Sequence, residues 1–460
     1  MAESSYDCIF IGSGPGGYVG AIRAAQLGMK TAVVESDLVG GRCLNYACIP
    51  AKAVLRVADV LGEIREADAY GITVNEPAVD FEAVGARRNK VVKTLTGGVS
   101  GLLKRNGVDV VEGHASVTDD ANVKVGGNFD GNEIEARFVV LATGSVKRAL
   151  PGTQFGGRVI GTEEAWALAA LPATLAVVGA GASGSEIASA YARLGSEVTL
   201  YEALDRVLPT EDADISKIAE RGFKKQGITV RTGVFVEDVQ SGADSVTFSV
   251  AGEPQSAEWL VIAAGRAPDI EGLGLQEAGV ELAADGLIAV DGAQRTSVAG
   301  VYAIGDLVAG PALAHKASDE GIIAAEDAAG LETHPLAHVD IPRATFCHPN
   351  VASFGLTEQQ ARDAGHDVVV GKLGFGAVGA GTVYGDRSGL VKIVGDRTYG
   401  ELLGGHIVCT KATELIQELV NVRALEGGYG EVARMVHGHP TLSEAVMEAA
   451  RDADGWLIHG

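Results

Sequence analysis

One glycine-rich motif occurs twice in this chain and constrains its fold more than any other feature. In the first copy, an apolar strand is followed by Gly12-Ser13-Gly14-Pro15-Gly16-Gly17, a helix, and a second strand that ends in Glu35. The second copy begins at Gly179 and ends in Glu202. These residues lie 167 positions after Gly12 and Glu35, respectively. Strand, glycine turn, helix and an acid about 20 residues on are the context of a Rossmann unit. We therefore predict an α/β chain with two dinucleotide-binding units.

The glycines and the acid have separate roles in such a unit. Glycines let the backbone approach a pyrophosphate, the helix N-terminus faces its charge, and the acid accepts a hydrogen bond from a ribose hydroxyl. No basic residue flanks Glu202, so the second unit is predicted to bind NAD rather than NADP, whose 2′-phosphate a carboxylate would repel. The predicted NAD residues are Gly179, Gly181, Gly184, Glu202 and Gly265, and the first unit is predicted to bind FAD through Gly12, Gly14, Gly17 and Glu35.

Further turns complete the predicted flavin site. Thr143, Gly144 and Ser145 follow a buried strand, as does the turn at Gly265. Asp306 ends another apolar strand, and a helix is predicted from about 312 to 329. The Asp306 carboxylate suits a sugar-like hydroxyl chain, and the helix N-terminus favours negative charge on a flavin. The alternative is that Asp306 is only a turn or N-cap residue.

Cys43 and Cys48 follow the first motif closely and form a candidate redox pair. Residues five apart in a regular helix are roughly 8 to 9 Å apart at Cα, whereas a disulfide requires less than about 7 Å. A bond between them therefore requires either that Cys43 lies outside the regular helix or that the helix is distorted, and Pro50, whose ring clashes one turn back, supplies such a distortion. Two unrelated buried thiols are the alternative on spacing alone, although cytosolic disulfides are usually catalytic.

A third candidate cluster lies near the C-terminus, in His437-Gly438-His439-Pro440-Thr441-Leu442-Ser443-Glu444. A histidine suits proton transfer near neutral pH, and a carboxylate can fix its tautomer and raise its basicity. The proline bends the chain, so His439 and Glu444 are able to meet. Alternatively, Thr441 to Glu444 is a capping box and His439 a surface residue before a capped helix.

Composition limits the classes of partner and compartment. The 460 residues are enough for about three domains, and five scattered cysteines do not suit a secreted disulfide scaffold. A net charge of −23 repels nucleic acid and anionic membranes. It favours a basic protein partner, or is an adaptation for solubility or high salt. We expect a cytoplasmic protein without a membrane span, a nucleic-acid partner or a metal site.

The whole order of motifs resembles the flavin-dependent pyridine nucleotide–disulfide oxidoreductases, from about Tyr6 to Gly460. Leu313-Ala314-His315-Lys316-Ala317 and His439-Pro440-Thr441-Leu442-Ser443-Glu444 are most similar to members that oxidise dihydrolipoyl groups with NAD. The resemblance implies FAD and NAD as cofactors. It leaves two alternatives, a reductase of another small disulfide and a catalytically quiet flavoprotein subunit.

The resemblance also implies the organisation of the chain and the roles of its residues. It implies an FAD domain (1–147), an NAD domain (148–268), a central segment completing the FAD site (269–337) and a C-terminal interface domain (338–460) of a homodimer. The partner would be the lipoyl domain of a dihydrolipoyl acyltransferase or a glycine cleavage carrier protein. The implied roles are Cys43 for interchange with the lipoyl sulfur, Cys48 for contact with the flavin, His439 as base, Glu444 as its support, Lys52 and Glu186 as an ion pair near the flavin, and Ala314 in FAD binding.

One departure from the family pattern concerns the dithiol. Arg42 stands where threonine is common and Ala47 where glycine is common. A nearby cation favours a thiolate, so Arg42 is expected to affect the thiol pKa and the flavin potential.

Overall fold

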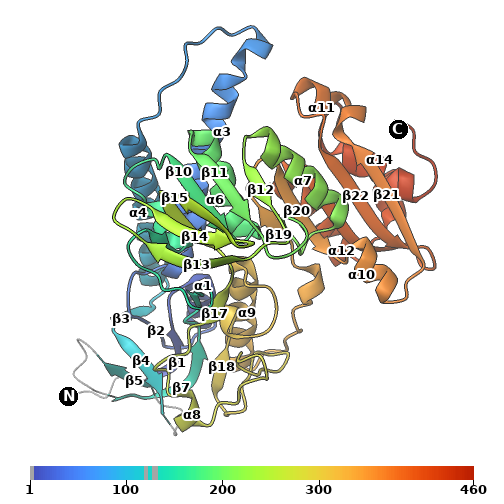
Figure 1. Cartoon of the computed structure of the whole chain (residues 1–460). Coiled ribbons are helices and arrows are strands. Elements are labelled where there is room, and N and C mark those ends of the chain that lie inside the picture. The colour runs from blue at the N-terminus through green and yellow to red at the C-terminus, as the bar shows by residue number, and fades with distance from the viewer. Residues whose placement is uncertain (1–4, 119–122, 127–132) are drawn as a thin grey trace. The chain divides into compact units, whose positions relative to one another are not determined.

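The computed structural model describes residues 5–118, 123–126 and 133–460. The backbone forms two compact units, each assembled from separate segments of the chain (Figure 1). The first unit contains residues 1–53, 85–148 and 265–338, and the second contains 54–84, 149–264 and 339–460. Within the described ranges, no helix has both the length and the apolar character required to cross a bilayer.

The first unit is built on a parallel sheet in the order β18-β7-β1-β2-β3. Alternate residues of a strand point to opposite faces, so Cys8 and Phe10 pack with helices α1, α4 and α9 on one face. Ile9 and Ile11 pack on the other face with the small antiparallel sheet β4-β5-β6. The elements are β1 (Tyr6–Ile11), α1 (Pro15–Gln26), β2 (Thr31–Glu35), α4 (Phe81–Arg105), β3 (Asp109–Glu112), β4 (His114–Val117), β5 (Val123–Gly126), β6 (Glu133–Ile134), β7 (Ala136–Leu141), β18 (Val301–Ala303) and α9 (Ala314–Ala328).

The second unit contains the second parallel sheet, in the order β12-β11-β10-β16-β9. Its core elements repeat the strand–helix–strand order of the first, and an antiparallel meander, β13-β14-β15, follows. The elements are β9 (Val159–Ile160), β10 (Thr174–Val178), α6 (Ala182–Leu194), β11 (Glu197–Tyr201), α7 (Ala213–Lys225), β12 (Thr229–Arg231), β13 (Val236–Ser241), β14 (Val246–Val250), β15 (Glu253–Ala257) and β16 (Trp259–Ile262). The predicted α/β fold with two Rossmann-type sheets is confirmed.

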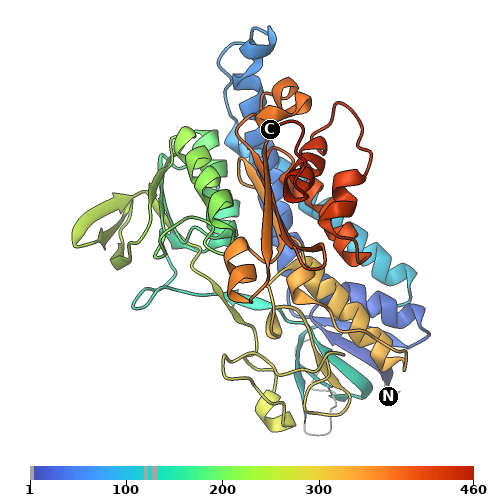
Figure 2. The same cartoon turned by 90° about the vertical axis from the view of Figure 1, so that its right-hand side faces the viewer.

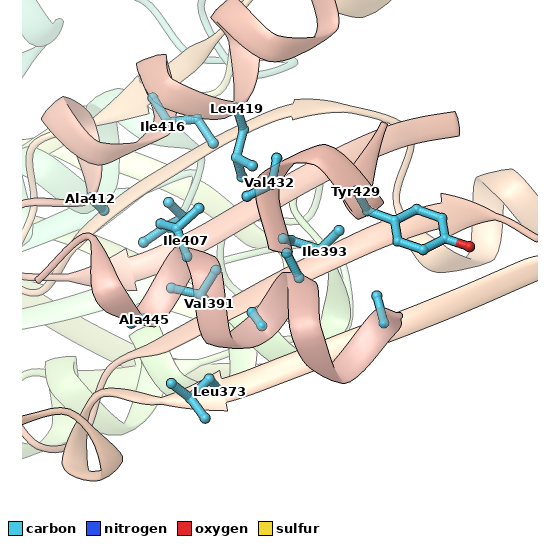
Figure 3. Packing of buried hydrophobic residues seen from close by; sticks show 14 of the residues in the cluster. Leu373, Val391, Ile393, Ile407, Ala412, Ile416, Leu419, Tyr429, Val432 and Ala445 are labelled. Atoms are coloured by element: carbon cyan, nitrogen blue, oxygen red, sulfur yellow. The ribbon is translucent and has the colours of Figure 1, made fainter. Parts of the chain in front are cut away.

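The C-terminal part of the second unit is an antiparallel sheet, β19-β20-β23-β22-β21, which helices cover (Figures 1 and 2). Figure 3 shows how Val391, Ile393 and Ile407 of this sheet pack against Leu419 and Ala445 from the helices. The elements are β19 (Arg343–Thr345), β20 (Asn350–Gly355), α10 (Glu358–Asp363), β21 (Val368–Gly374), β22 (Leu390–Asp396), β23 (Glu401–Cys409), α12 (Ala412–Ala424), α13 (Tyr429–Arg434) and α14 (Glu444–Ala453).

Candidate active site

The glycines of the first fingerprint meet two different constraints. A Cβ on Gly12 would lie 2.5 Å from the carbonyl oxygen of Ala142, and one on Gly17 would lie 1.9 Å from that of Gly12. Both must therefore be glycine for the turn to pack against the neighbouring strand end. A Cβ on Gly14 would meet nothing within 4 Å, so space is open beside the N-terminus of α1. This is where a pyrophosphate is expected to bind.

The second fingerprint has the same geometry. A Cβ on Gly179 would lie 2.6 Å from the carbonyl oxygen of Ala263, and one on Gly184 would lie 1.8 Å from that of Gly179. A Cβ on Gly181 would again meet nothing within 4 Å. The turn after β16 thus supports the second fingerprint as the turn after β7 supports the first. Two equivalent cradles fit two dinucleotides.

The two acids also occupy equivalent places. Glu35 is buried, and its carboxylate accepts hydrogen bonds from the backbone of Ser13 at 2.9 Å and of Asp37 at 2.9 Å. Glu202 accepts in the same way from Ala180 N at 2.6 Å and from Leu204 N at 2.9 Å. Each carboxylate is therefore held beside its glycine turn. An ionised carboxylate has about four acceptor positions, so capacity remains for a ribose hydroxyl.

Asp306 lies in a 3-10 turn, η2 (Gly305–Leu307), directly after β18. The Ser145 hydroxyl donates a hydrogen bond to the Asp306 carboxylate. Arg266 donates from Nε to Ser145 Oγ at 2.7 Å, and Thr143 Oγ1 donates to the carbonyl of Asp269 at 2.6 Å. These hydrogen bonds thus bring together predicted FAD residues from two segments of the first unit, 85–148 and 265–338.

A buried ion pair that we did not predict from the sequence holds the Asp306 turn. Lys316 and Glu320 of α9 lie 3.0 Å apart with fully buried side chains. Lys316 Nζ donates to the carbonyl of Gly305 at 2.8 Å, and Gly305 N donates to Glu320 Oε2 at 2.8 Å. Because one pair satisfies both backbone groups of Gly305, it fixes the peptide before Asp306. The signal in the sequence is the i,i+4 spacing of Lys316 and Glu320, which usually marks a surface pair.

The dithiol segment is interrupted where the spacing of the cysteines requires it. Cys43 lies in α2 (Gly41–Asn45), and Cys48 opens α3 (Cys48–Arg65). Pro50 falls in the first turn of α3, where its missing N–H has no intrahelical partner to lose. A Cβ on Gly41 would lie 2.7 Å from the Cα of Gly14. The segment therefore packs directly against the first dinucleotide fingerprint.

The two cysteines meet as thiols rather than as a disulfide. A hydrogen bond with Cys48, together with burial, raises the pKa of the Cys43 thiol. Lys52 and Arg42 act in the opposite direction and lower that pKa. The expectation that Arg42 influences the thiol is therefore supported, although the hydrogen bond with Cys48 dominates in this state. This proximity is what dithiol–disulfide exchange requires.

Lys52 lies one helical turn after Cys48, in the first unit. Glu186 lies in α6 of the second unit, where its side chain is buried and accepts a hydrogen bond from Phe346 N at 2.8 Å. The pairing of Lys52 with Glu186 stays a prediction.

The C-terminal pair meets as predicted. His439 Nδ1 lies 2.9 Å from Glu444 Oε1, and Thr441 N donates to Glu444 Oε2 at 2.8 Å. Burial opposes ionisation, but the hydrogen bonds from Thr441 and His439 lower the pKa of the Glu444 carboxyl. The His439 side chain is 76% exposed and open to a substrate in this single chain. Glu444 thus orients the histidine and also accepts the backbone N–H of Thr441 in the turn before α14, whose N-cap residue Ser443 makes no side-chain cap hydrogen bond.

His437 and Glu418 form a second pair, which our sequence analysis did not predict. His437 Nε2 lies 2.5 Å from Glu418 Oε1 of α12, and the His437 side chain is only 6% exposed. The hydrogen bond with Glu418 raises the pKa of His437. This pair anchors the start of the loop that carries His439, while Glu444 holds its end. The only sign of this pair in the sequence was a second histidine, His437, separated from His439 by one residue.

Comparison with known proteins is consistent with this geometry. Residues 6–321 match the family model of pyridine nucleotide-disulphide oxidoreductases, and residues 341–450 match the model of their dimerisation domain. The chain is 44% identical to a dihydrolipoyl dehydrogenase of Mycobacterium tuberculosis and 40% identical to one of Bacillus subtilis, over 99% of each chain. Its fold is similar to that of LpdA from Mycobacterium tuberculosis (TM-score 0.91, 28% identity, 97% and 99% of the two chains covered). It also resembles the HOCl-induced flavoprotein disulfide reductase RclA of Escherichia coli (TM-score 0.85, 26% identity, 96% and 98% covered).

Proposed function

The chain belongs to the pyridine nucleotide–disulphide oxidoreductase family, and we propose that it oxidises a protein-bound dihydrolipoyl group with NAD⁺. The products are the lipoyl disulfide, NADH and a proton. The observation that carries this proposal is the hydrogen-bonded pair Cys43 and Cys48 packed against the first dinucleotide fingerprint. Its location lets a substrate dithiol exchange electrons with a bound flavin.

The chain's own residues manage the sulfur and proton chemistry. In the oxidised enzyme, Cys43 and Cys48 form a disulfide. His439 removes a proton from one substrate thiol, and the resulting thiolate attacks the Cys43 sulfur, which breaks the Cys43–Cys48 bond and releases Cys48 as a thiolate. The second substrate sulfur then closes the lipoyl disulfide and releases Cys43, so that the Cys43–Cys48 disulfide is reduced by two electrons. Bound FAD supplies a route for this electron pair to NAD⁺. Glu444 holds the imidazole in place, with Glu444 Oε1 2.9 Å from His439 Nδ1.

The cofactor sites follow from the two cradles. FAD is held by the first fingerprint, by Glu35 and by the turns at Thr143 to Ser145 and Asp306, with Ala314 at the start of α9. NAD is held by the second fingerprint, Glu202 and the turn at Gly265. Lys52 and Glu186 pair near the flavin. The domains are those of the sequence analysis: 1–147 for FAD, 148–268 for NAD, 269–337 completing the FAD site, and 338–460 for the interface.

A homodimer is the proposed working form. The matched dimerisation domain supports it, as do large apolar side chains that this part of the chain leaves in solvent. Val436 is 99% exposed, Leu425 83% and Ile458 62%. Val436 directly precedes the loop of His437 and His439, and in the proposed dimer His439 serves the dithiol of the partner subunit. The proposed substrate carrier is the lipoyl domain of an acyltransferase or of a glycine cleavage system, in the cytoplasm.

A second candidate is the reduction of a different small disulfide. The fold similarity to a disulfide reductase favours it. The two functions differ in the thiol that reduces the enzyme.

Anaerobic stopped-flow reduction tests the proposal. The holoenzyme is mixed with dihydrolipoamide and, in parallel, with glutathione and with a monothiol such as 2-mercaptoethanol. We expect rapid reduction by dihydrolipoamide alone, followed by NADH formation when NAD⁺ is added. Rapid reduction by glutathione with slow reduction by dihydrolipoamide would instead support the second candidate.

A further inference from the structure

Helix α4 carries positive charge in a strongly acidic chain. The chain has 60 acidic and 37 basic residues, yet α4 (Phe81–Arg105) has only one acid, Glu82. Among the residues that the structure describes, no ion pair joins the exposed Arg87, Lys90 or Lys93 to a carboxylate. The basic residues of the helix are Arg87, Arg88, Lys90, Lys93, Lys104 and Arg105.

These charges, apart from Arg88, share one face of the helix. Val84, Val99 and Leu103 form the buried face, and a helix turns about 100° per residue. Arg87, Lys90 and Lys93 therefore lie on the solvent face, as do the small residues that follow them. We call this surface, formed by Arg87, Lys90, Lys93, Gly97, Gly98, Lys104 and Arg105, the α4 face.

Two glycines of the α4 face have no internal explanation. Gly97 and Gly98 are exposed, and a Cβ on either would meet nothing within 4 Å. Glycine in the interior of a helix is destabilising relative to alanine, and here no neighbouring atom of the chain requires it. Glycines that leave a helix backbone bare permit close approach by another molecule.

The α4 helix also borders the redox segment. Val99 and Leu103, on its buried face, belong to the same apolar cluster as Leu44, and Cys43 packs against that cluster. All four residues lie in the first unit. The α4 face is therefore separated from the cluster that Cys43 contacts by the thickness of one helix, about 10–12 Å.

We propose that the α4 face docks the protein domain that carries the lipoyl group, and that this domain presents an acidic surface around its lipoyl lysine. The inference rests on the proposed function and extends it to recognition of the carrier. Free dihydrolipoamide is uncharged, so a basic surface does not attract it. An acidic carrier domain, in contrast, is attracted and oriented by such a surface. The excess negative charge elsewhere on the chain repels the same carrier, so the α4 face selects the docking site.

The test compares two triple charge reversals in the full holoenzyme. One is Arg87→Glu/Lys90→Glu/Lys93→Glu on α4. The matched control is Lys217→Glu/Arg221→Glu/Lys225→Glu on α7, where the three basic residues are also exposed and outside the ion pairs of the described residues. Both variants change the net charge equally. The substrates are free dihydrolipoamide and a recombinant, reduced lipoyl domain of negative net charge.

We expect the α4 variant to lower kcat/KM for the lipoyl domain about tenfold or more at low ionic strength. Its kcat/KM for free dihydrolipoamide should stay within about twofold, and the α7 control should leave both values unchanged. The loss should shrink in about 0.5 M salt, which screens exposed charges. Gly97→Gln should raise the melting temperature and yet lower kcat/KM for the lipoyl domain alone.

Several results would overturn the inference. Equal losses in the α4 and α7 variants would mean that only net charge matters. An unchanged kcat/KM for the lipoyl domain in the α4 variant would exclude the docking role. The role would also be excluded if wild type and the α7 variant bound RNA, the α4 variant did not, and all three still oxidised the lipoyl domain. If wild type oxidises neither substrate, the proposed function itself fails, which is evident before any variant is compared.

Discussion

Lys392 provides a quantitative test of how the second unit is held together. Its ammonium lies 2.8 Å from a carboxylate oxygen of each of Asp212, Asp214 and Glu358. The Lys392 side chain is 3% exposed, and so is that of Asp212. Lys392 lies in β22, whereas Asp212 is the N-cap residue of α7. The perturbation is Lys392→Met, which keeps most of the side-chain volume and removes the charge.

The expected cost comes mainly from Asp212. Removing one partner of a buried ion pair costs about 3–5 kcal/mol, because the other charge stays buried and uncompensated. Asp214 and Glu358 are 40% and 28% exposed and can regain water, so they add little. Lys372 is the matched control: it lies 2.7 Å from Asp214 but is 43% exposed. An exposed pair contributes about 0–1 kcal/mol, so Lys372→Met should be nearly neutral.

The cost should also depend on pH in a defined direction. Burial opposes ionisation, but hydrogen bonds from Lys372 and Lys392 lower the pKa of Asp214 to about 2, and those from Lys392 lower the pKa of Asp212. A carboxyl with a depressed folded-state pKa stabilises the fold above its unfolded pKa, about 4, and loses that contribution as pH falls through the folded value. The penalty of Lys392→Met should therefore be largest near pH 7 and shrink below about pH 4.

Tryptophan fluorescence during urea unfolding measures this effect selectively. All three tryptophans, Trp166, Trp259 and Trp456, belong to the second unit. Because a multidomain enzyme need not unfold in one step, the quantity to compare is the midpoint of the tryptophan transition in wild type, Lys392→Met and Lys372→Met. Coincident midpoints of the two variants at pH 7 would refute the reasoning, and so would a penalty that grows on acidification.

Three further predictions concern the site. His439→Gln should lower dihydrolipoamide oxidation roughly 10²- to 10⁴-fold, the scale of general acid–base catalysis, and leave reduction by NADH intact; a loss below about threefold would leave only the capping role. Glu202→Gln should reduce the preference for NAD over NADP about tenfold or more, while Glu35→Gln should affect FAD retention and not that ratio; the opposite pattern in kcat/KM would exchange the two nucleotide assignments. Cys48→Ser should abolish the long-wavelength absorbance that a thiolate gives beside oxidised flavin, whereas Cys43→Ser should retain it; the reverse spectra would exchange the roles of the sulfurs.

The Rossmann units were predictable because their geometry follows from local spacing. Gly12 and Gly179 must be glycine because a strand-end carbonyl lies 2.5 and 2.6 Å from their Cβ positions. Such a contact recurs wherever strand, turn and helix have these lengths. The same motif at two places 167 residues apart in the sequence therefore predicted both dinucleotide cradles. The interruption between Cys43 and Cys48 was predictable for a similar reason, since disulfide geometry excludes a regular helix.

The buried polar contacts were not predictable from local pattern. Lys392 lies between apolar residues in Val391-Lys392-Ile393, and alternation of this kind usually places the lysine in solvent. In the structure, the second face of this sheet is also covered, and Lys392 meets Asp212 across 180 residues of sequence. Lys316 and Glu320 similarly have the spacing of an exposed helical pair. Only tertiary burial turns these residues into supports.

Two of the supporting pairs lie next to the groups proposed to act. Lys316 and Glu320 hold the peptide that precedes Asp306, and His437 with Glu418 holds the loop that precedes His439. An exposed base such as His439 can reach a bulky carrier-bound substrate, but exposure also deprives it of packing that would fix its position. Orientation therefore has to come from neighbours that are themselves dehydrated, because hydrogen bonds to charged groups are strongest where water does not compete. The buried Lys316–Glu320 pair and the partly buried His437–Glu418 pair supply rigidity to groups that must remain accessible.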